Sequence, residues 1–193
     1  MTDAHRNPAE ELRQVFAGLE PVSMREETDA DKDFCRRLYH GVRIAELSAV
    51  GWPHEQVEGF IDQQFHAQRT HYRKYYPRAG FMIIEHASHP IGRWYLQADE
   101  KELRLMEVTL LPEWRNRGIG TQLMQCLTDW SESTARPITL HVEPFNPAYR
   151  LYRRLGFETI ADRGVYHFMQ RLPASPDGNR QSNAASKSAV QTR

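Results

Sequence analysis

Long hydrophobic runs are absent from this sequence of 193 residues. No apolar stretch approaches the roughly 18 residues that a membrane-spanning helix needs. The polar segment from Met1 to Glu11 also lacks the apolar core of a secretory signal. We therefore expect a cytoplasmic protein with no membrane partner.

Cysteine is scarce, because only Cys35 and Cys126 are present and they lie far apart. This excludes a disulfide framework and the ligand spacings of structural zinc sites, so we expect two reduced, structural thiols. Nine histidines are present, but His66 and His71 are five residues apart instead of the four that place two ligands on one helix face. We expect no bound metal.

An excess of charge of one sign is also missing, since 25 Lys and Arg residues balance 25 Asp and Glu residues. Such a chain has no net field to gather nucleic acid, and no recognised nucleic-acid-binding motif is present, so we expect no such partner. Eleven Gly and eleven Pro residues are too few for a low-complexity chain. The length and the 40% hydrophobic content are typical of one globular domain.

The composition divides the chain into three parts. Residues 1–20 are predicted to form an extension with a short amphipathic helix, because apolar residues recur at helical spacing between residues 7 and 19. Residues 21–173 form the predicted domain. Residues 174–193 contain one large aliphatic residue, Val190, and are predicted to be a disordered tail because they cannot bury enough apolar area.

The period of the hydrophobic pattern changes several times along the predicted domain. Two-residue alternation and short apolar runs predict strands over residues 22–26, 81–85, 91–96, 103–111, 138–142, 157–160 and 165–169. Helical spacing predicts helices over residues 29–51, 53–76, 117–132 and 147–155. A hairpin-rich first half followed by β-α-β units implies a mixed sheet with helices on both faces.

The most informative segment runs from Leu110 to Thr121 (LLPEWRNRGIGT), where a strand breaks at a proline and enters a helix through two glycines. Such a turn directs unpaired N–H groups and the positive end of a helix at one point, which suits a pyrophosphate. Arg115 and Arg117 can add charge-assisted hydrogen bonds. Alone, the segment also fits an ordinary turn with a solvated basic patch. It lacks the Gly-Lys-Ser/Thr of a Walker loop and the glycine spacing of a Rossmann domain.

A second segment, from Asn146 to Phe157 (NPAYRLYRRLGF), predicts a short helix that carries a tyrosine and ends at Gly-Phe. Together the two segments resemble the GNAT acetyltransferase superfamily. Its Arg-x-x-Gly-x-Gly loop matches Arg115 to Gly120, and its Asn…Ala…Leu-Tyr…Leu-Gly-Phe helix matches Asn146 to Phe157. The resemblance is strong over residues 103–169 and extends by element order back to Val22.

The resemblance implies an α+β, αβα-layered GNAT fold: a mixed, mostly antiparallel sheet of about seven strands, with splayed central strands and helices on both faces. It also implies acetyl-CoA as co-substrate, with its pantetheine arm between the strands at 103–111 and 138–142. The implied CoA-binding residues are Val108, Thr109 and Leu110 through the main chain, Arg115, Asn116, Arg117, Gly118, Ile119, Gly120 and Thr121 around the pyrophosphate, and Asn146 from the second motif.

The implied activity is transfer of an acetyl group to a primary amine of a small molecule or peptide, by direct attack in a ternary complex. An alkyl ammonium with a pKa near about 10.4 must first lose a proton. Tyr152 occupies the position where the family often places the acid that protonates the leaving thiolate. Glu107, His141 and Glu143 are the candidate bases, with water as an alternative.

The acceptor is expected to contact the two N-terminal helices of the domain, where Trp52, Gln64, Gln68 and Tyr72 offer polar-tipped side chains. The rings and amides also fit an ordinary core and surface. A rival function is a catalytically silent GNAT domain that senses acyl-CoA or docks a partner through residues 7–19. The presence of Tyr152 and Glu107 favours the enzyme. The acceptor, the acyl length and a homodimer stay open.

Overall fold

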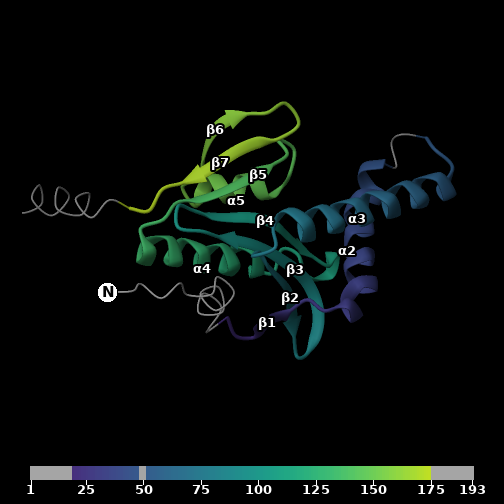
Figure 1. The fold of residues 1–193 in the computed structure, drawn as a ribbon, viewed down its shortest axis with the longest axis horizontal. Coiled ribbons are helices and arrows are strands. Elements are labelled where there is room, and N and C mark those ends of the chain that lie inside the picture. The colour runs from purple at the N-terminus through teal and green to yellow at the C-terminus, as the bar shows by residue number, and fades with distance from the viewer. Residues whose placement is uncertain (1–18, 48–50, 175–193) are drawn as a thin grey trace, which may run out of the picture.

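A computed structural model describes residues 19–47 and 51–174, which form one open sheet of seven strands in the order β1-β2-β3-β4-β5-β7-β6 (Figure 1). The strands are β1 (Val22–Glu26), β2 (Gly80–His86), β3 (His89–Ala98), β4 (Leu103–Leu110), β5 (Ile138–Val142), β6 (Glu158–Asp162) and β7 (His167–Arg171). All neighbouring pairs are antiparallel except β4 and β5, which are parallel. The predicted mixed, mostly antiparallel sheet is confirmed.

In the described residues, four helices cover the sheet, and two short 3-10 helices precede two of them. The helices are α2 (Lys32–Leu47), α3 (His54–Tyr75), α4 (Ile119–Thr134) and α5 (Ala148–Arg154), with 3-10 turns at Asp29–Asp31 and Pro112–Trp114. In Figure 1, α2 and α3 lie together at one end of the molecule, away from α4. Among the described helices, none is both long and apolar enough to cross a membrane.

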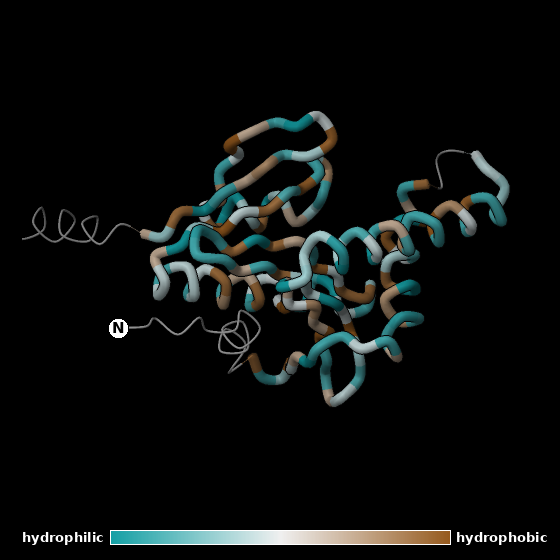
Figure 2. The backbone as a smooth tube through the Cα atoms, viewed as in Figure 1, coloured by the Kyte–Doolittle hydropathy of each residue, from teal (hydrophilic) through white to brown (hydrophobic). Residues whose placement is uncertain are grey.

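The sheet packs a core on each face, because successive strand residues point to opposite sides. On one face, Leu123 and Leu127 of α4 join a cluster with Trp94 of β3. On the other face, Phe65 of α3 packs with Cys35 of α2 and Ile83 of β2. Figure 2 shows that hydrophobic and hydrophilic residues are mixed along the helices and strands, as expected for elements with one buried face. Helices on both faces are thus confirmed.

The element boundaries differ from the predicted ones where the local backbone turns. The helix predicted from residue 117 begins at Ile119, because Asn116 and Gly118 adopt positive φ angles of 59° and 83°. Strand β6 begins after Phe157, whose N–H donates to the Tyr152 carbonyl at 3.0 Å and so closes α5 around Gly156.

Two predicted segments lie outside the described residues. The helix predicted for residues 7–19 is described only at Leu19, which is buried. The predicted tail is described only at Ala174, whose N–H donates to Glu132 at 2.7 Å. The three-part division of the chain therefore stays a prediction.

Strands β4 and β5 separate part-way along their length. Strand β4 pairs with β3 from Leu103 to Leu110, but it pairs with β5 only from Leu103 to Leu105, opposite Ile138 to Leu140. Beyond that point the two parallel strands have no register pairs. The expected splay of the central strands is therefore confirmed, and it opens the middle of the sheet.

Candidate functional site

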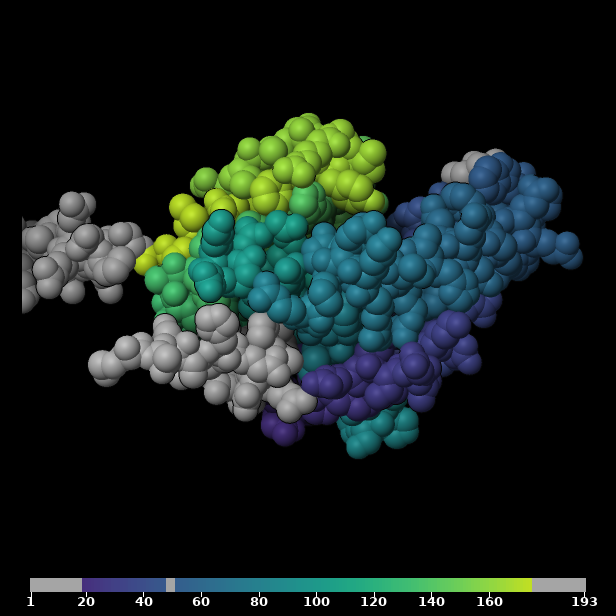
Figure 3. Space-filling model, in the orientation of Figure 1, coloured from purple at the N-terminus to yellow at the C-terminus, as the bar shows by residue number. Residues whose placement is uncertain are grey.

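The gap between β4 and β5 opens into a cleft of about 350 Å³. Its walls come from α2, α3, β4, β5, Asn146 before α5, Tyr152 within α5, and Tyr166 before β7. In the space-filling view, the β6–β7 end of the molecule (yellow-green) and α3 (blue) face each other across a recess (Figure 3). A volume of this size suits a small ligand.

The backbone of β4 offers hydrogen-bonding groups to this gap. The N–H of Leu111 donates to the Ile91 carbonyl of the β2–β3 hairpin at 2.8 Å. In an antiparallel pair, successive residues direct their N–H groups to opposite sides. The N–H groups of Val108 and Leu110 therefore point away from β3, toward the side on which β4 and β5 separate.

The turn before α4 leaves open space at its glycines. A Cβ atom at Gly118 would meet nothing within 4 Å, and one at Gly120 would meet only the Leu151 side chain at 3.9 Å. Arg115 folds back so that its Nε–H donates to the Leu110 carbonyl at 2.9 Å, and the Arg117 guanidinium lies 5.0 Å from the Trp114 ring centre. The uncovered N–H groups of the first helical turn thus face space that an anion can occupy.

Tyr152 reaches the cleft from α5. Its side chain is buried, with 6% of the residue exposed, and its ring packs against Phe157. Burial raises the pKa of its hydroxyl to about 12, so the group stays protonated at neutral pH. Among the described residues its hydroxyl has no hydrogen-bond partner, and it lines the cleft. A proton donor is therefore available there.

Glu107 lies in the same cleft on β4 and is held on one side. The Arg93 guanidinium donates to its Oε1 from Nε at 2.8 Å and also from a terminal nitrogen, and the Thr109 hydroxyl donates to that oxygen at 3.1 Å. Oε2 is buried and has no partner among the described residues. One oxygen is thus occupied, and the other is left to accept a hydrogen bond.

His141 and Glu143 line the cleft from β5 and from the residue after it. The His141 ring stacks on Phe168 at 4.7 Å. Burial, together with the nearby Arg163 charge, lowers the pKa of this imidazole, so it is neutral at pH 7. Within the described part of the chain, the Glu143 carboxylate forms no ion pair.

Comparisons with known proteins identify the family of this chain. The family model described as "Acetyltransferase (GNAT) family" matches residues 42–157, more than half of the chain. The chain belongs to the GNAT acetyltransferase family. A search of curated proteins finds no match.

Solved GNAT structures have the same fold at low sequence identity. PaiA N-acetyltransferase from Thermoplasma acidophilum, in complex with coenzyme A, aligns with a TM-score of 0.59 and 16% identity over 78% of this chain and 98% of its own. An acetyltransferase from Thermus thermophilus aligns with a TM-score of 0.56 and 16% identity, over 80% of this chain and 98% of its own. Spermidine N-acetyltransferase from Vibrio cholerae, in complex with CoA and spermine, aligns with a TM-score of 0.54 and 20% identity, over 79% of this chain and 95% of its own.

Within this GNAT domain, nine of the nineteen predicted site residues line the cleft, and Leu110 is not among them. Those that line the cleft are Glu107, Val108, Thr109, His141, Glu143, Asn146 and Tyr152, with Gln64 and Gln68. The turn residues 115–121 lie beyond the end of β4 and do not line it. The Asn146 amide oxygen accepts the Ala148 N–H at 2.9 Å, so this side chain also caps α5.

Two of the predicted acceptor residues lie outside the cleft of the GNAT domain. Tyr72 lines a separate, very small cavity and packs against Tyr95 at 5.9 Å, where burial raises its pKa. Trp52 packs edge-on against Phe60 at 5.4 Å, just before α3 begins. Gln68 does reach the cleft, but its amide oxygen accepts a hydrogen bond from Arg93 at 3.1 Å.

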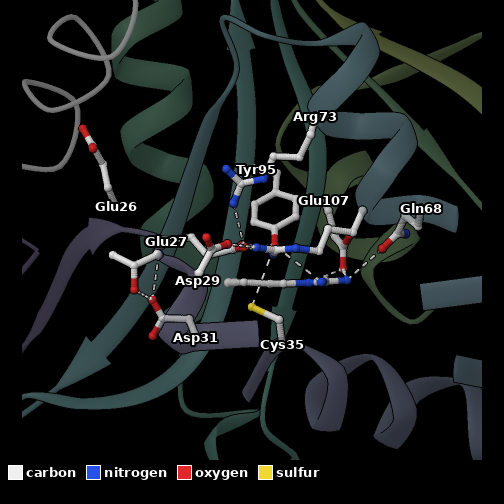
Figure 4. Close-up of polar contacts among 12 residues, drawn as sticks. Glu26, Glu27, Asp29, Asp31, Cys35, Gln68, Arg73, Tyr95 and Glu107 are labelled. Atoms are coloured by element: carbon white, nitrogen blue, oxygen red, sulfur yellow. Dashed lines mark hydrogen bonds and ion pairs between the residues drawn. The ribbon is translucent and has the colours of Figure 1, made fainter. Parts of the chain in front are cut away.

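The sequence interpretation missed Arg93, the most buried charged side chain of the site, with 1% exposed. A charged residue inside an otherwise apolar strand is a signal, because a buried charge needs a partner. Behind it, the Tyr95 hydroxyl donates to Glu27, which also accepts hydrogen bonds from Arg69 and, at 2.9 Å, from Arg73 (Figure 4). This network fastens α3 to the sheet beneath the cleft.

No group of three or more His, Cys, Asp or Glu side chains that could hold a metal occurs in residues 19–47 and 51–174. Both cysteines are free, and burial raises the pKa of the Cys35 thiol to about 11.

Proposed function

We propose that this protein transfers an acetyl group from acetyl-CoA to a primary amine by direct attack in a ternary complex. The observation that carries the proposal is the cleft at the separation of β4 and β5. The cleft is lined by Val108, whose N–H points away from β3, by a buried protonated phenol and by a carboxylate oxygen without a partner among the described residues. Acyl transfer to an amine needs these three kinds of group.

The residues present fit acetyl-CoA. The N–H groups of Val108 and Leu110 can bond the pantetheine amides, much as an edge strand bonds an added strand. The uncovered N–H groups at residues 118–121 can bond the pyrophosphate, because among the described residues a Cβ at Gly118 would meet nothing within 4 Å and one at Gly120 would meet only Leu151. Solved structures of the same fold were determined with coenzyme A, which supports this placement.

In the proposed step, the amine nitrogen attacks the thioester carbonyl carbon, the C–N bond forms, and the C–S bond breaks. The N–H of Leu110 stabilises the oxyanion that develops on the carbonyl oxygen. Tyr152 donates a proton to the departing thiolate. The attacking nitrogen loses its extra proton to a base in the cleft.

We assign the base to Glu107, acting through Oε2. Arg93 and Thr109 fix the carboxylate through Oε1, so its free oxygen has a defined direction. A base is selected first by geometry, and a fixed carboxylate oxygen within the cleft meets that requirement. His141 and Glu143 line the same cleft and are the alternatives that mutagenesis must compare.

The test is a thiol-release assay with acetyl-CoA against a panel of alkyl amines, diamines, amino acids and peptides. We expect stoichiometric release of CoA thiol and of an N-acetyl product with at least one amine. Calorimetry with acetyl-CoA measures binding separately. Binding without acetylation of any amine would contradict the enzymatic proposal and support an acyl-CoA sensor.

A further inference from the structure

This inference rests on the proposed function and names the acceptor class. We infer that the acceptor is a small aliphatic diamine, whose second, non-reacting ammonium group lies between the carboxylates of Glu46 and Glu143. The first amine of the same molecule then reaches Glu107 and the thioester.

The charges that line the cleft do not balance. Glu46, Glu107 and Glu143 face it, while Arg43 is the one arginine or lysine among its lining residues. Arg93 adds a second cation behind Glu107. Three carboxylates against two guanidiniums leave one negative charge. A diamine whose reacting nitrogen is deprotonated carries one positive charge, which matches it.

The two outer carboxylates are those of Glu46 and Glu143. They repel each other, and a cation bound between them would reduce that repulsion. The Glu46 side chain is 40% exposed. Its partial burial raises its pKa, and the Glu143 charge raises it further, against the opposing effect of Arg43. Arg43 pairs with Glu46 and donates to Gln64 at 3.2 Å, so it is held on the α2–α3 side. Glu143, across the cleft at the end of β5, has no ion pair among the described residues.

Polar groups without partners mark the other end of the acceptor site. Tyr152 has 6% of its surface exposed and no hydrogen-bond partner for its hydroxyl in the described chain, and Oε2 of Glu107 is buried and unpaired. Both face the same cleft as the two outer carboxylates. We take Tyr152 and Glu107 as the reacting end of the cleft, and Glu46 and Glu143 as its anionic end.

The size of the cleft limits the acceptor. About 350 Å³ lies near the lower end of the range for small-molecule sites, and the thioester must share this space. A short, unbranched carbon chain between two nitrogens fits these limits. A bulky acceptor or a folded protein surface does not.

The test compares three acceptors of equal chain length: putrescine, n-butylamine and γ-aminobutyrate. They differ only in the group at the far end, which is cationic, neutral or anionic. We expect kcat/KM with acetyl-CoA to be about tenfold higher for putrescine than for n-butylamine, and lowest for γ-aminobutyrate. A tenfold ratio corresponds to about 1.4 kcal/mol of differential binding.

Substitutions locate the anionic end. Glu46→Gln and Glu143→Gln should each reduce the putrescine to n-butylamine ratio several-fold. The ratio is the readout because any effect of Glu143 on the chemical step is common to both amines. Glu55→Gln is the matched control: it removes the same charge from an exposed position on α3, about 13 Å along the helix from Gln64. Its ratio should equal that of the parent protein.

The outcomes separate this inference from the proposed function. An n-butylamine rate equal to or above that of putrescine overturns the diamine assignment and leaves the acetyltransferase intact. An unchanged ratio in folded Glu46→Gln and Glu143→Gln variants overturns the anionic site. If acetyl-CoA binds but no amine in the panel is acetylated, the proposed function falls and the inference falls with it.

Discussion

A single hydroxyl carries most of the chemistry that we assign to α5. Tyr152 is buried between the helix and the cleft, and the absence of solvent raises its pKa to about 12. A phenol of this kind is fully protonated when the reaction begins. It can therefore assist the departing thiolate, whose negative charge develops only in the transition state.

Tyr152→Phe removes this hydroxyl and keeps the ring that packs on Phe157. We expect kcat to fall by roughly 10²-fold, which is within the range for general acid catalysis. Acetyl-CoA affinity should change little. The measurements are steady-state turnover with the acceptor found in the amine panel and calorimetric binding of acetyl-CoA.

Tyr149→Phe is the matched control for that variant. Tyr149 lies one turn earlier on α5, and its hydroxyl is 3.4 Å from the Thr159 hydroxyl. Loss of this exposed contact should leave turnover close to that of the parent protein. Equal turnover of all three proteins would remove Tyr152 from the mechanism and leave protonation of the thiolate to water.

At the scale of elements, the turn into α4 decides whether CoA can bind. Gly120→Glu places a carboxylate at the position proposed for the pyrophosphate. An acidic side chain in the first turn favours the helix, and a Cβ at Gly120 would meet only Leu151, at 3.9 Å, so folding should be retained. We expect calorimetric binding of acetyl-CoA to be lost while the melting temperature is maintained.

Gly59→Glu is the control for the added charge and bulk. Gly59 is exposed in the second turn of α3, and a Cβ there would meet nothing within 4 Å. Acetyl-CoA affinity should equal that of the parent protein. If a folded Gly120→Glu variant binds acetyl-CoA as tightly as this control, the turn is not the pyrophosphate site.

Strand β4 packs closely against β3 at Gly92, which has no side chain to keep the two strands apart. A Cβ atom at Gly92 would lie 2.5 Å from the Thr109 carbonyl oxygen and 2.7 Å from a Leu110 methyl carbon. Gly92→Ala should therefore displace β4 at its separated end. We expect a loss of about 1–3 kcal/mol in the free energy of unfolding, measured by chemical denaturation.

The same substitution at Gly41 should have the opposite sign. Gly41 is exposed within α2, and a Cβ added there would have nothing within 4 Å. Alanine is favoured over glycine in a helix interior by about 1 kcal/mol, so Gly41→Ala should stabilise the protein. Equal effects of the two variants would show that the close approach at Gly92 does not constrain β4.

At the scale of the whole molecule, acidic side chains fasten the β1 region and α3 to the sheet. Burial alone would raise the pKa of Glu27, but hydrogen bonds from Tyr95 and Arg69 lower it below its usual value. The Arg25 guanidinium holds the pKa of Asp31 well below its usual range. Both carboxylates are therefore more acidic in the folded protein than in the unfolded chain.

This difference gives a signed dependence of stability on pH. A depressed pKa stabilises the fold above the unfolded values, about 3.9 for Asp and 4.3 for Glu, and the stability is lost as the pH falls. We expect the melting temperature to fall as the pH is lowered from about 5 to 3. Asp31→Asn should lower stability at neutral pH and flatten that decrease, whereas Asp33→Asn, at an exposed neighbouring position, should not. If the melting temperature of the Asp31→Asn variant fell with pH as steeply as that of the parent protein, this account would be contradicted.

Local patterns in the sequence were sufficient for most of the elements and for the family. The pattern of residues 138–142 predicts β5, and the apolar stripe at helical spacing predicts α4. Both predictions succeed because each pattern depends only on residues that are close together along the chain. The two glycines at the start of α4, Gly118 and Gly120, and the Gly-Phe after α5 are likewise local. They led to the GNAT resemblance, which the family comparison confirms.

Only the tertiary structure decided how the site is completed. Arg93 and Glu107 are fourteen residues apart and meet because β3 and β4 pair in one register. Gln68 reaches the cleft and Tyr72 does not, although both lie on α3, because the crossing of α3 over the sheet sets which side chains face it. Glu46 of α2 and Glu143 after β5 line the same cleft although they are far apart in the sequence. Periodicity reports which face of an element is buried, but register and packing determine which residues meet across elements.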